Sequence, residues 1–107
     1  MASAATLKKL NNFVSLAESC GITLRKVILF GSYARNKQTK YGDIDVAMVA
    51  DEFCGVPSED VKLFMKAMLK YYMVQRQTYN TKDFTPDRDP FVEEIMRTGI
   101  EIQTVPK

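Results

Sequence analysis

The sequence predicts one folded domain of the α/β (α+β) class, and three observations lead to that prediction. The chain has 107 residues, the usual length of a single domain, so residues 1–107 are treated as one unit. Its apolar content of 46% is ordinary for a globular protein. Segments of helical and strand periodicity alternate along the chain without internal repeats, which indicates a sheet packed against helices.

Three segments have the apolar spacing of amphipathic helices. Apolar residues recur at intervals of three and four over 6–20, with Thr6 as the expected N-cap. The same spacing extends over 58–72, where Ser58 is the expected N-cap and acidic residues occupy the first turn. The expected apolar face of this helix consists of Val61, Phe64, Met65, Met68, Leu69 and Tyr72. A last helix is expected over 89–98, capped near Asp87 or Asp89 and ended by Gly99.

Four shorter segments favour strands. Residues 26–30 form an apolar run with a β-branched start, and residues 43–50 alternate acidic and apolar side chains before becoming wholly apolar. A third strand of mixed polarity is expected over 74–79, and a short final strand over 100–105.

The composition excludes several kinds of chemistry. The chain contains no histidine, which removes histidine acid–base catalysis and histidine-ligated zinc. Cys20 and Cys54 lack a metal-binding spacing and are expected to be reduced thiols of a cytoplasmic protein. We find no signal peptide and no apolar stretch long enough for a membrane span. The net charge of +2 argues against nucleic-acid binding driven by charge alone.

The residues with a chemical signal lie between positions 31 and 45. Gly31 permits a sharp turn and a close ligand approach, and Ser32 follows at the start of a helical turn, where it can bind a phosphate. Asp43 and Asp45 are two apart on a strand, so both carboxylates point to one face. Neighbouring carboxylates repel unless a cation lies between them, and Mg²⁺ prefers such ligands together with substrate phosphates.

This stretch resembles the signature of the DNA polymerase β-like nucleotidyltransferase superfamily, in which Gly-Ser is followed after ten residues by Asp-x-Asp. Here the ten residues 33–42 separate Gly31-Ser32 from Asp43-Ile44-Asp45. The Ala34-Arg35 pair and the ending FVEEIMRTGIEI extend the likeness over nearly the whole chain. The chain is similar to the stand-alone minimal nucleotidyltransferases, which often pair with a helical HEPN or substrate-binding protein encoded by a neighbouring gene.

The resemblance implies a nucleotidyltransferase fold, a small mixed sheet with helices packed mainly on one face. It implies that Gly31, Ser32 and Arg35 bind the phosphates of a nucleoside triphosphate, and that Asp43 and Asp45 bind Mg²⁺ as the catalytic carboxylates. The implied reaction transfers a nucleoside monophosphate, with ATP as the expected donor, to a hydroxyl on a protein or small molecule. A toxin–antitoxin setting with a HEPN partner fits this family, and a homodimer is left open.

The sequence departs from the family pattern at one position. Active members of the family usually have a third carboxylate on the next strand of the site, and this chain lacks it. No Asp or Glu occurs from Val61 to Lys82, and the alignment places Gln77 at that position. An amide can ligate but cannot take a proton. The alternative function is therefore a regulatory module that binds a nucleotide or partner with little or no turnover.

Each of these residues also has a purely structural interpretation. Gly31-Ser32 alone is compatible with a helix-capping turn, and Asp43 and Asp45 with a strand that begins with solvated acids. Arg35 fits a solvated loop as well as a phosphate contact. Lysines at 62, 66 and 70 are the pattern of a solvated helix face, with RNA or partner binding as the alternative.

Overall fold

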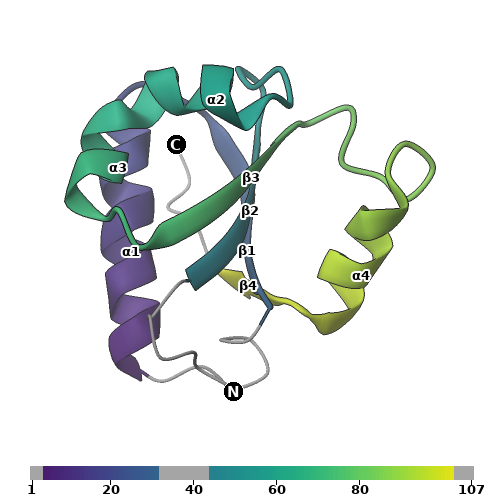
Figure 1. Cartoon of the computed structure of the whole chain (residues 1–107), viewed down its shortest axis with the longest axis horizontal. Coiled ribbons are helices and arrows are strands. Elements are labelled where there is room, and N and C mark those ends of the chain that lie inside the picture. Colours follow the sequence, from purple (N-terminus) through teal and green to yellow (C-terminus); the bar gives the residue numbers. More distant parts are fainter. Residues whose placement is uncertain (1–3, 32–43, 103–107) are drawn as a thin grey trace.

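The computed structural model describes residues 4–31 and 44–102, which form a four-stranded mixed sheet with helices on both faces (Figure 1). Helices and strands alternate along the chain, so the α/β (α+β) class is confirmed. The elements are α1 (Ala4–Glu18), β1 (Leu24–Phe30), β2 (Ile44–Ala50), α2 (Pro57–Asp60), the 3-10 helix η1 (Val61–Phe64), α3 (Met65–Lys70), β3 (Val74–Asn80), α4 (Pro90–Thr98) and β4 (Ile100–Ile102).

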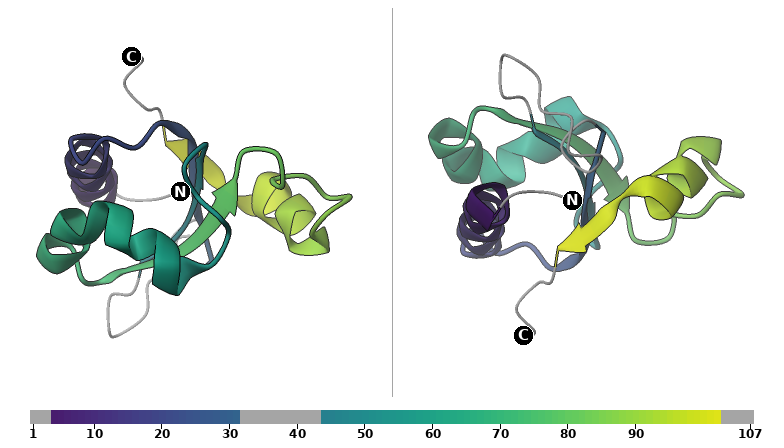
Figure 2. Two further views of the ribbon diagram at one scale, coloured as in Figure 1. Left: turned by 90° about the horizontal axis from the view of Figure 1, so that it is seen from above. Right: turned by 90° about the horizontal axis from the view of Figure 1, so that it is seen from below.

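The strands lie in the order β3-β2-β1-β4. β1 pairs antiparallel with both β2 and β4, whereas β2 and β3 are parallel. A parallel pair needs a long crossover, and the segment with α2, η1 and α3 provides it. Figure 2 shows α1 and α3 on one side of the sheet and α4 on the other. The predicted mixed sheet with helices mainly on one face is therefore confirmed.

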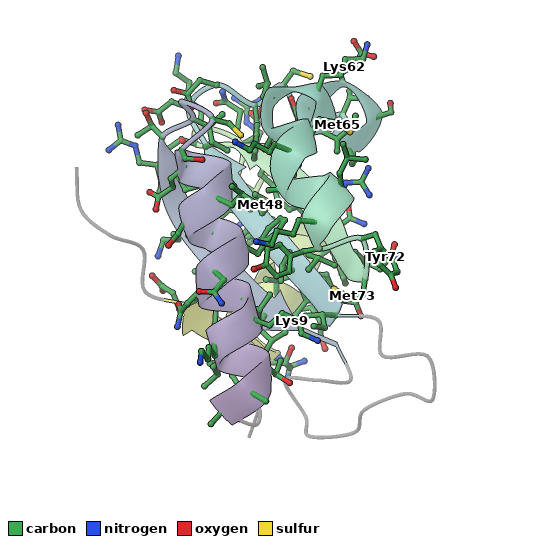
Figure 3. All side chains as sticks on the ribbon, turned by 90° about the vertical axis from the view of Figure 1, so that its left-hand side faces the viewer. Lys9, Met48, Lys62, Met65, Tyr72 and Met73 are labelled. Atoms are coloured by element: carbon green, nitrogen blue, oxygen red, sulfur yellow. The ribbon has the colours of Figure 1, made fainter. Side chains whose placement is uncertain are left out.

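The main hydrophobic core lies between the sheet and the α1–α3 layer. Phe13 of α1 is fully buried, and its ring makes edge contacts with Phe64 and Tyr71 at centroid distances of 6.2 and 6.1 Å. Figure 3 shows Met48 of β2 behind these helices, and this side chain has no exposed surface. The apolar period of α1 and the inward side chains of β2 therefore build one common core.

The helix predicted over 58–72 is broken into the three segments α2, η1 and α3. The break falls at Phe64, whose backbone (φ −138°, ψ 35°) is not helical because its ring turns into the core. The apolar stripe predicted for a continuous helix is wrong at its end, since Leu69 and Tyr72 are 74% and 76% exposed. Figure 3 shows Tyr72 on the outer surface.

Two of the predicted helix starts differ from the structure. α1 begins at Ala4, so Thr6 lies inside the helix and is buried rather than acting as the N-cap. α2 begins at Pro57 because the fixed φ of proline suits the first helical position, and its N-cap is Val56 rather than Ser58. None of the described helices combines the length and apolar character that crossing a membrane requires.

α4 packs on the opposite face through a smaller apolar cluster. Ile95 of α4 is buried against Ile28 and Ala47 of the sheet. The helix starts as predicted, because the Asp89 side chain accepts a hydrogen bond from the Phe91 backbone N–H at 3.0 Å.

Candidate nucleotidyltransferase site

Strand alternation separates the polar residues of β2 and β3 from the core. Val46 and Val74 are buried beneath α1 and α3. Their neighbours Asp45 and Gln75 therefore point to the other face, on which α4 packs, and Gln77 lies on that face as well. Asp45 is half-buried and both glutamines are exposed, so this polar row is open to ligands.

The turn after β1 lies directly against the Asp45 carboxylate. Phe30 is the pairing partner of Asp45, which brings the end of β1 beside the beginning of β2. Gly31 has a φ of +75°, a conformation that side chains disfavour, and a β-carbon there would lie 2.5 Å from Asp45 Oδ2. Position 31 therefore requires glycine both for its backbone conformation and for the approach of the carboxylate.

The parallel pairing places Gln75 beside Asp45 and Gln77 beside Ala47. From the strand spacing and rise, the Cα atoms of Asp45 and Gln77 are roughly 8 Å apart. Gln75, the direct neighbour of Asp45, was not predicted as a site residue. Residues 74–79 are of mixed polarity without any acid, and this pattern fits Gln75 as well as Gln77. The sequence of either strand does not reveal the register of a parallel pair, so the pattern could not identify the neighbour of Asp45.

Three of the predicted site residues, Ser32, Arg35 and Asp43, lie outside the described residues. Within the described ranges, no group of three or more Asp, Glu, Cys or His side chains is arranged to hold a metal ion. Asp45 is nevertheless suited to contribute to such a site, because its carboxylate is partly exposed against a side-chain-free turn. One or two carboxylates completed by substrate phosphates are the ligand set that Mg²⁺ commonly uses.

A small cavity lies beside this contact, between the end of β1 and α4. Its volume is about 200 Å³. Phe30 and Phe91 close one side with an edge contact of 5.7 Å between ring centroids. Glu94 brings a carboxylate to the lining, and Arg97 forms an ion pair with it. The lining residues are Phe30, Gly31, Phe91, Glu94, Ile95 and Thr98.

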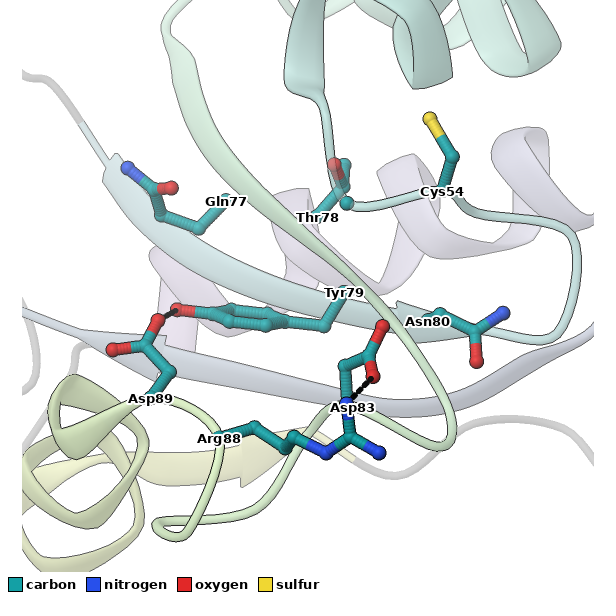
Figure 4. A pocket seen from close by; sticks show the side chains of 9 residues that line it. Cys54, Gln77, Thr78, Tyr79, Asn80, Asp83, Arg88 and Asp89 are labelled. Atoms are coloured by element: carbon teal, nitrogen blue, oxygen red, sulfur yellow. Dashed lines mark hydrogen bonds and ion pairs between the residues drawn. The ribbon is translucent and has the colours of Figure 1, made fainter.

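A larger hollow, which we call the β3 groove, lies at the other end of β3 (Figure 4). Its volume is about 420 Å³, and Gln77 connects it to the polar row that contains Asp45. The lining is predominantly polar, which suits a hydrogen-bonding ligand. The residues that define the groove are Cys54, Gly55, Gln77, Thr78, Tyr79, Asn80, Asp83, Arg88 and Asp89.

Two polar pairs shape the lower wall of the β3 groove. The Tyr79 hydroxyl donates to Asp89 Oδ2 at 3.4 Å, and Arg88 forms an ion pair with Asp83 at 3.7 Å. Burial and the nearby carboxylate of Asp89 raise the pKa of Tyr79 to about 12, so its phenol is protonated at neutral pH. Tyr79 therefore acts as a hydrogen-bond donor in this wall.

The upper wall is held by the buried carboxylate of Asp60. This group accepts hydrogen bonds from the N–H groups of Cys54 and Gly55 at 2.8 and 2.9 Å, and from the Thr78 hydroxyl at 2.7 Å. Burial by itself would raise the pKa of Asp60, but these hydrogen bonds outweigh it and leave the pKa below its ordinary value. The ionised Asp60 therefore fixes the 54–55 turn against β3.

The lysines at 62, 66 and 70 are exposed on the α2–α3 segment. Lys62 forms an ion pair with Glu59 at 3.3 Å, and Lys70 lies over the Tyr71 ring at 5.9 Å. Both contacts are local ones within or beside the helices, which is the behaviour of a solvated helix face.

The mixed sheet and the Gly31–Asp45 contact are the arrangement expected of a nucleotidyltransferase domain, and comparison with known families agrees with this class. Residues 7–95 match the model of the nucleotidyltransferase domain, so the chain belongs to this family. A protein of Methanocaldococcus jannaschii named "Putative protein adenylyltransferase" is 44% identical over 52 residues. That match covers 48% of this chain and 48% of the relative, so the chain spans about half the length of the protein that it resembles.

Proposed function

We propose that this domain transfers a nucleoside monophosphate from ATP to a hydroxyl group of an acceptor protein, with Mg²⁺ as cofactor. The observation that carries the proposal is the packing of the Gly31 turn against the Asp45 carboxylate in a domain of the nucleotidyltransferase family. The name of the archaeal relative supports adenylyl as the transferred group and protein as the acceptor.

Different residues would bind the metal ion and the phosphates of the donor. Asp45, together with Asp43, would hold the divalent ion, which when bound neutralises charge on the phosphates of the donor. Gly31 lets the backbone come close to the Asp45 carboxylate. Ser32 and Arg35 are proposed to donate hydrogen bonds to the phosphates of the donor. Fixed positioning of this kind is the main contribution of a protein to phosphoryl and nucleotidyl transfer.

The transfer balances as a single displacement at the α-phosphorus. The acceptor oxygen forms a bond to this phosphorus, while the bond from phosphorus to the oxygen that bridges the α- and β-phosphates breaks. Pyrophosphate leaves with that electron pair, and the proton of the acceptor hydroxyl passes to water. No carboxylate occurs on β3, so the proposal assigns no base from that strand.

The test follows label from α-labelled ATP into the protein fraction, using the chain with the product of the neighbouring gene and Mg²⁺. We expect incorporation that chelation with EDTA abolishes, and that Asp45→Asn lowers by about a hundredfold or more. Glu18→Gln is the matched control, because it removes one carboxylate from α1 on the opposite face. Equal incorporation by Asp45→Asn and the control would refute the assignment of the site.

A second candidate is a module that binds nucleotide and regulates a partner without transfer. The absence of any acid from β3 favours it, since Gln75 and Gln77 cannot accept a proton. Asp43→Asn and Asp45→Asn discriminate between the two. If both variants retain the biological effect of the parent while ATP is bound and never consumed, the regulatory function is correct.

We also propose a helical HEPN-type partner in an antitoxin setting. Four large apolar side chains are exposed on and beside η1 and α3, and such a group supports a partner surface: Leu63, Met65, Leu69 and Tyr72. Co-purification with the neighbouring gene product should fail for Leu69→Glu and persist for Lys66→Glu, which changes charge on the same helix. Equal behaviour of the two variants would place the partner elsewhere.

A further inference from the structure

The outer edge of β3 is open in the described part of the chain. β3 is the terminal strand of the sheet, and β2 is its one neighbour among the described strands. The Met73 carbonyl accepts from the Ile44 N–H at 3.1 Å, so odd-numbered residues direct their backbone groups toward β2. By alternation, the backbone N–H and C=O of Arg76 and Thr78 point outward. Within residues 4–31 and 44–102 these outward groups have no backbone partner.

The β3 groove follows this open edge. Four consecutive residues, 77–80, line it, although their side chains alternate between the two faces of the sheet. Figure 4 shows Cys54 on the Thr78 side of the strand and Asp89 on the Tyr79 side. A hollow that contacts both faces of one strand lies at the margin of the sheet, where β3 has no outer neighbour among the described strands. Its volume of about 420 Å³ is sufficient for a short stretch of extended peptide.

We propose that the acceptor protein presents an extended, hydroxyl-bearing segment that adds to β3 as a further strand. This inference rests on the proposed transfer function and specifies how its acceptor is held. Strand addition satisfies the outward backbone groups of β3 and leaves alternate side chains of the segment on the Asp45 face. The added strand would run about 10 Å from β2, so a side chain that reaches across Gln75 or Gln77 approaches the donor site.

The edge position explains why β3 has polar side chains on the Asp45 face. Gln75 and Gln77 are exposed and uncharged, so they can bond to a passing peptide or hydroxyl without repelling a triphosphate. The Asp60 carboxylate fixes the 54–55 wall, and the Tyr79–Asp89 bond fixes the opposite wall. The groove is therefore formed before the segment binds, which reduces the cost of ordering it.

The test begins with a library of seven-residue peptides, each with one Ser, Thr or Tyr, bound to the full chain. For the best binder, backbone amide exchange of the protein should slow at Arg76 and Thr78. N-methylation of the alternate peptide residues whose N–H groups face β3 should weaken binding at least tenfold. N-methylation of the remaining residues, whose N–H groups point away from β3, should weaken it less than threefold. Arg76→Pro removes an outward N–H that the sheet does not use, so it should also weaken binding at least tenfold.

Arg76→Ala is the matched control, because it shortens the same side chain and keeps the backbone N–H; it should bind the peptide within threefold of the parent. Binding of ATP with Mg²⁺ by Arg76→Pro must equal that of the parent, which separates this test from donor binding. If the peptide protects the backbone amides of Arg76 and Thr78 but ATP is never transferred, strand addition is supported and the proposed transfer function is refuted. Absence of any millimolar binder, insensitivity to methylation phase, or β3-to-β3 pairing of two copies would overturn strand addition.

Discussion

The two faces of the sheet use the same strands for different purposes. On the face beneath α1 and α3, β2 contributes large side chains such as Ile44 and Met48 to a continuous core. On the face beneath α4, the same strand contributes Asp45 and then the small Ala47, and among the described residues one compact apolar cluster joins the helix to the sheet. The Asp45 site and the lower wall of the β3 groove, with Tyr79 and Asp89, lie on this second face.

This difference indicates that stability and chemistry are largely separated in this domain. The core face buries aromatic and branched side chains, so substitutions there should change the free energy of unfolding. The α4 face holds exposed or half-buried polar groups, whose loss removes little buried area. The first two predictions below pair a change at one place with a matched change elsewhere, and the third concerns the pH dependence of stability.

The largest effect is expected from the core face. Phe13→Ala removes a fully buried ring that contacts both Phe64 and Tyr71, so the free energy of unfolding should fall by about 4 kcal/mol. Urea unfolding followed by circular dichroism measures this loss. ATP binding per folded molecule should be unchanged, whereas Asp45→Asn should show the reverse pattern. A Phe13→Ala protein with normal stability would contradict the assignment of the core.

An intermediate effect is expected at the turn beside Asp45. Gly31→Ala places a methyl group 2.5 Å from Asp45 Oδ2, so the carboxylate must move, and ATP affinity with Mg²⁺ should fall about tenfold, or about 1.4 kcal/mol. Isothermal titration calorimetry measures the affinity.

Gly21→Ala is the control for this change, since Gly21 also has a positive φ (+98°) but nothing lies within 4 Å of the added carbon. Both variants should lose about 1 kcal/mol of stability from the backbone conformation alone. Equal ATP affinity in the two variants would show that the Gly31–Asp45 contact is unimportant for the donor.

The smallest effect concerns pH. The hydrogen bonds to Asp60 keep its pKa below the ordinary 3.8, and those from Arg25 and Thr81 lower the pKa of Asp51 to about 2. Because both pKa values are depressed on folding, their contribution is complete above about pH 5 and declines as the pH falls through 4 toward 2.

Urea midpoints measured from pH 7 to pH 2.5 should therefore be flat at first and then decrease. Asp60→Asn should flatten the acidic part of this curve, because the buried group that titrates is gone. A steeper decline in the variant than in the parent would contradict the assigned role of Asp60.

Much of the fold follows from short-range patterns in the sequence. The alternation of residues 43–50 predicted a strand, and β2 spans Ile44–Ala50. A cap near Asp87 or Asp89 was predicted because aspartate caps helices through its side chain, and the bond from the Phe91 N–H shows that Asp89 is the cap. The break at Phe64 could not be predicted in this way, since no proline or glycine marks it and the packing of its ring against Phe13 and Phe53 determines it.

The candidate site was predictable in part. Gly31 and Asp45 were expected to lie together from their place in a motif, and the structure brings them into contact. The sequence could not predict which residue of β3 lies beside Asp45, because the register of two parallel strands depends on the length and packing of the crossover between them. The β3 groove was missed for a similar reason, since its walls come from three separate segments.

The open edge of β3 has a consequence for solubility in a crowded cell. A strand of seven residues with unpaired backbone groups is a template on which other chains can aggregate. Here the strand has the polar sequence VQRQTYN, and the charged Arg76 lies at its centre among amide side chains. Such an edge stays accessible without attracting apolar neighbours. We therefore expect that replacing Arg76 by valine would leave the fold intact and make the protein prone to precipitate.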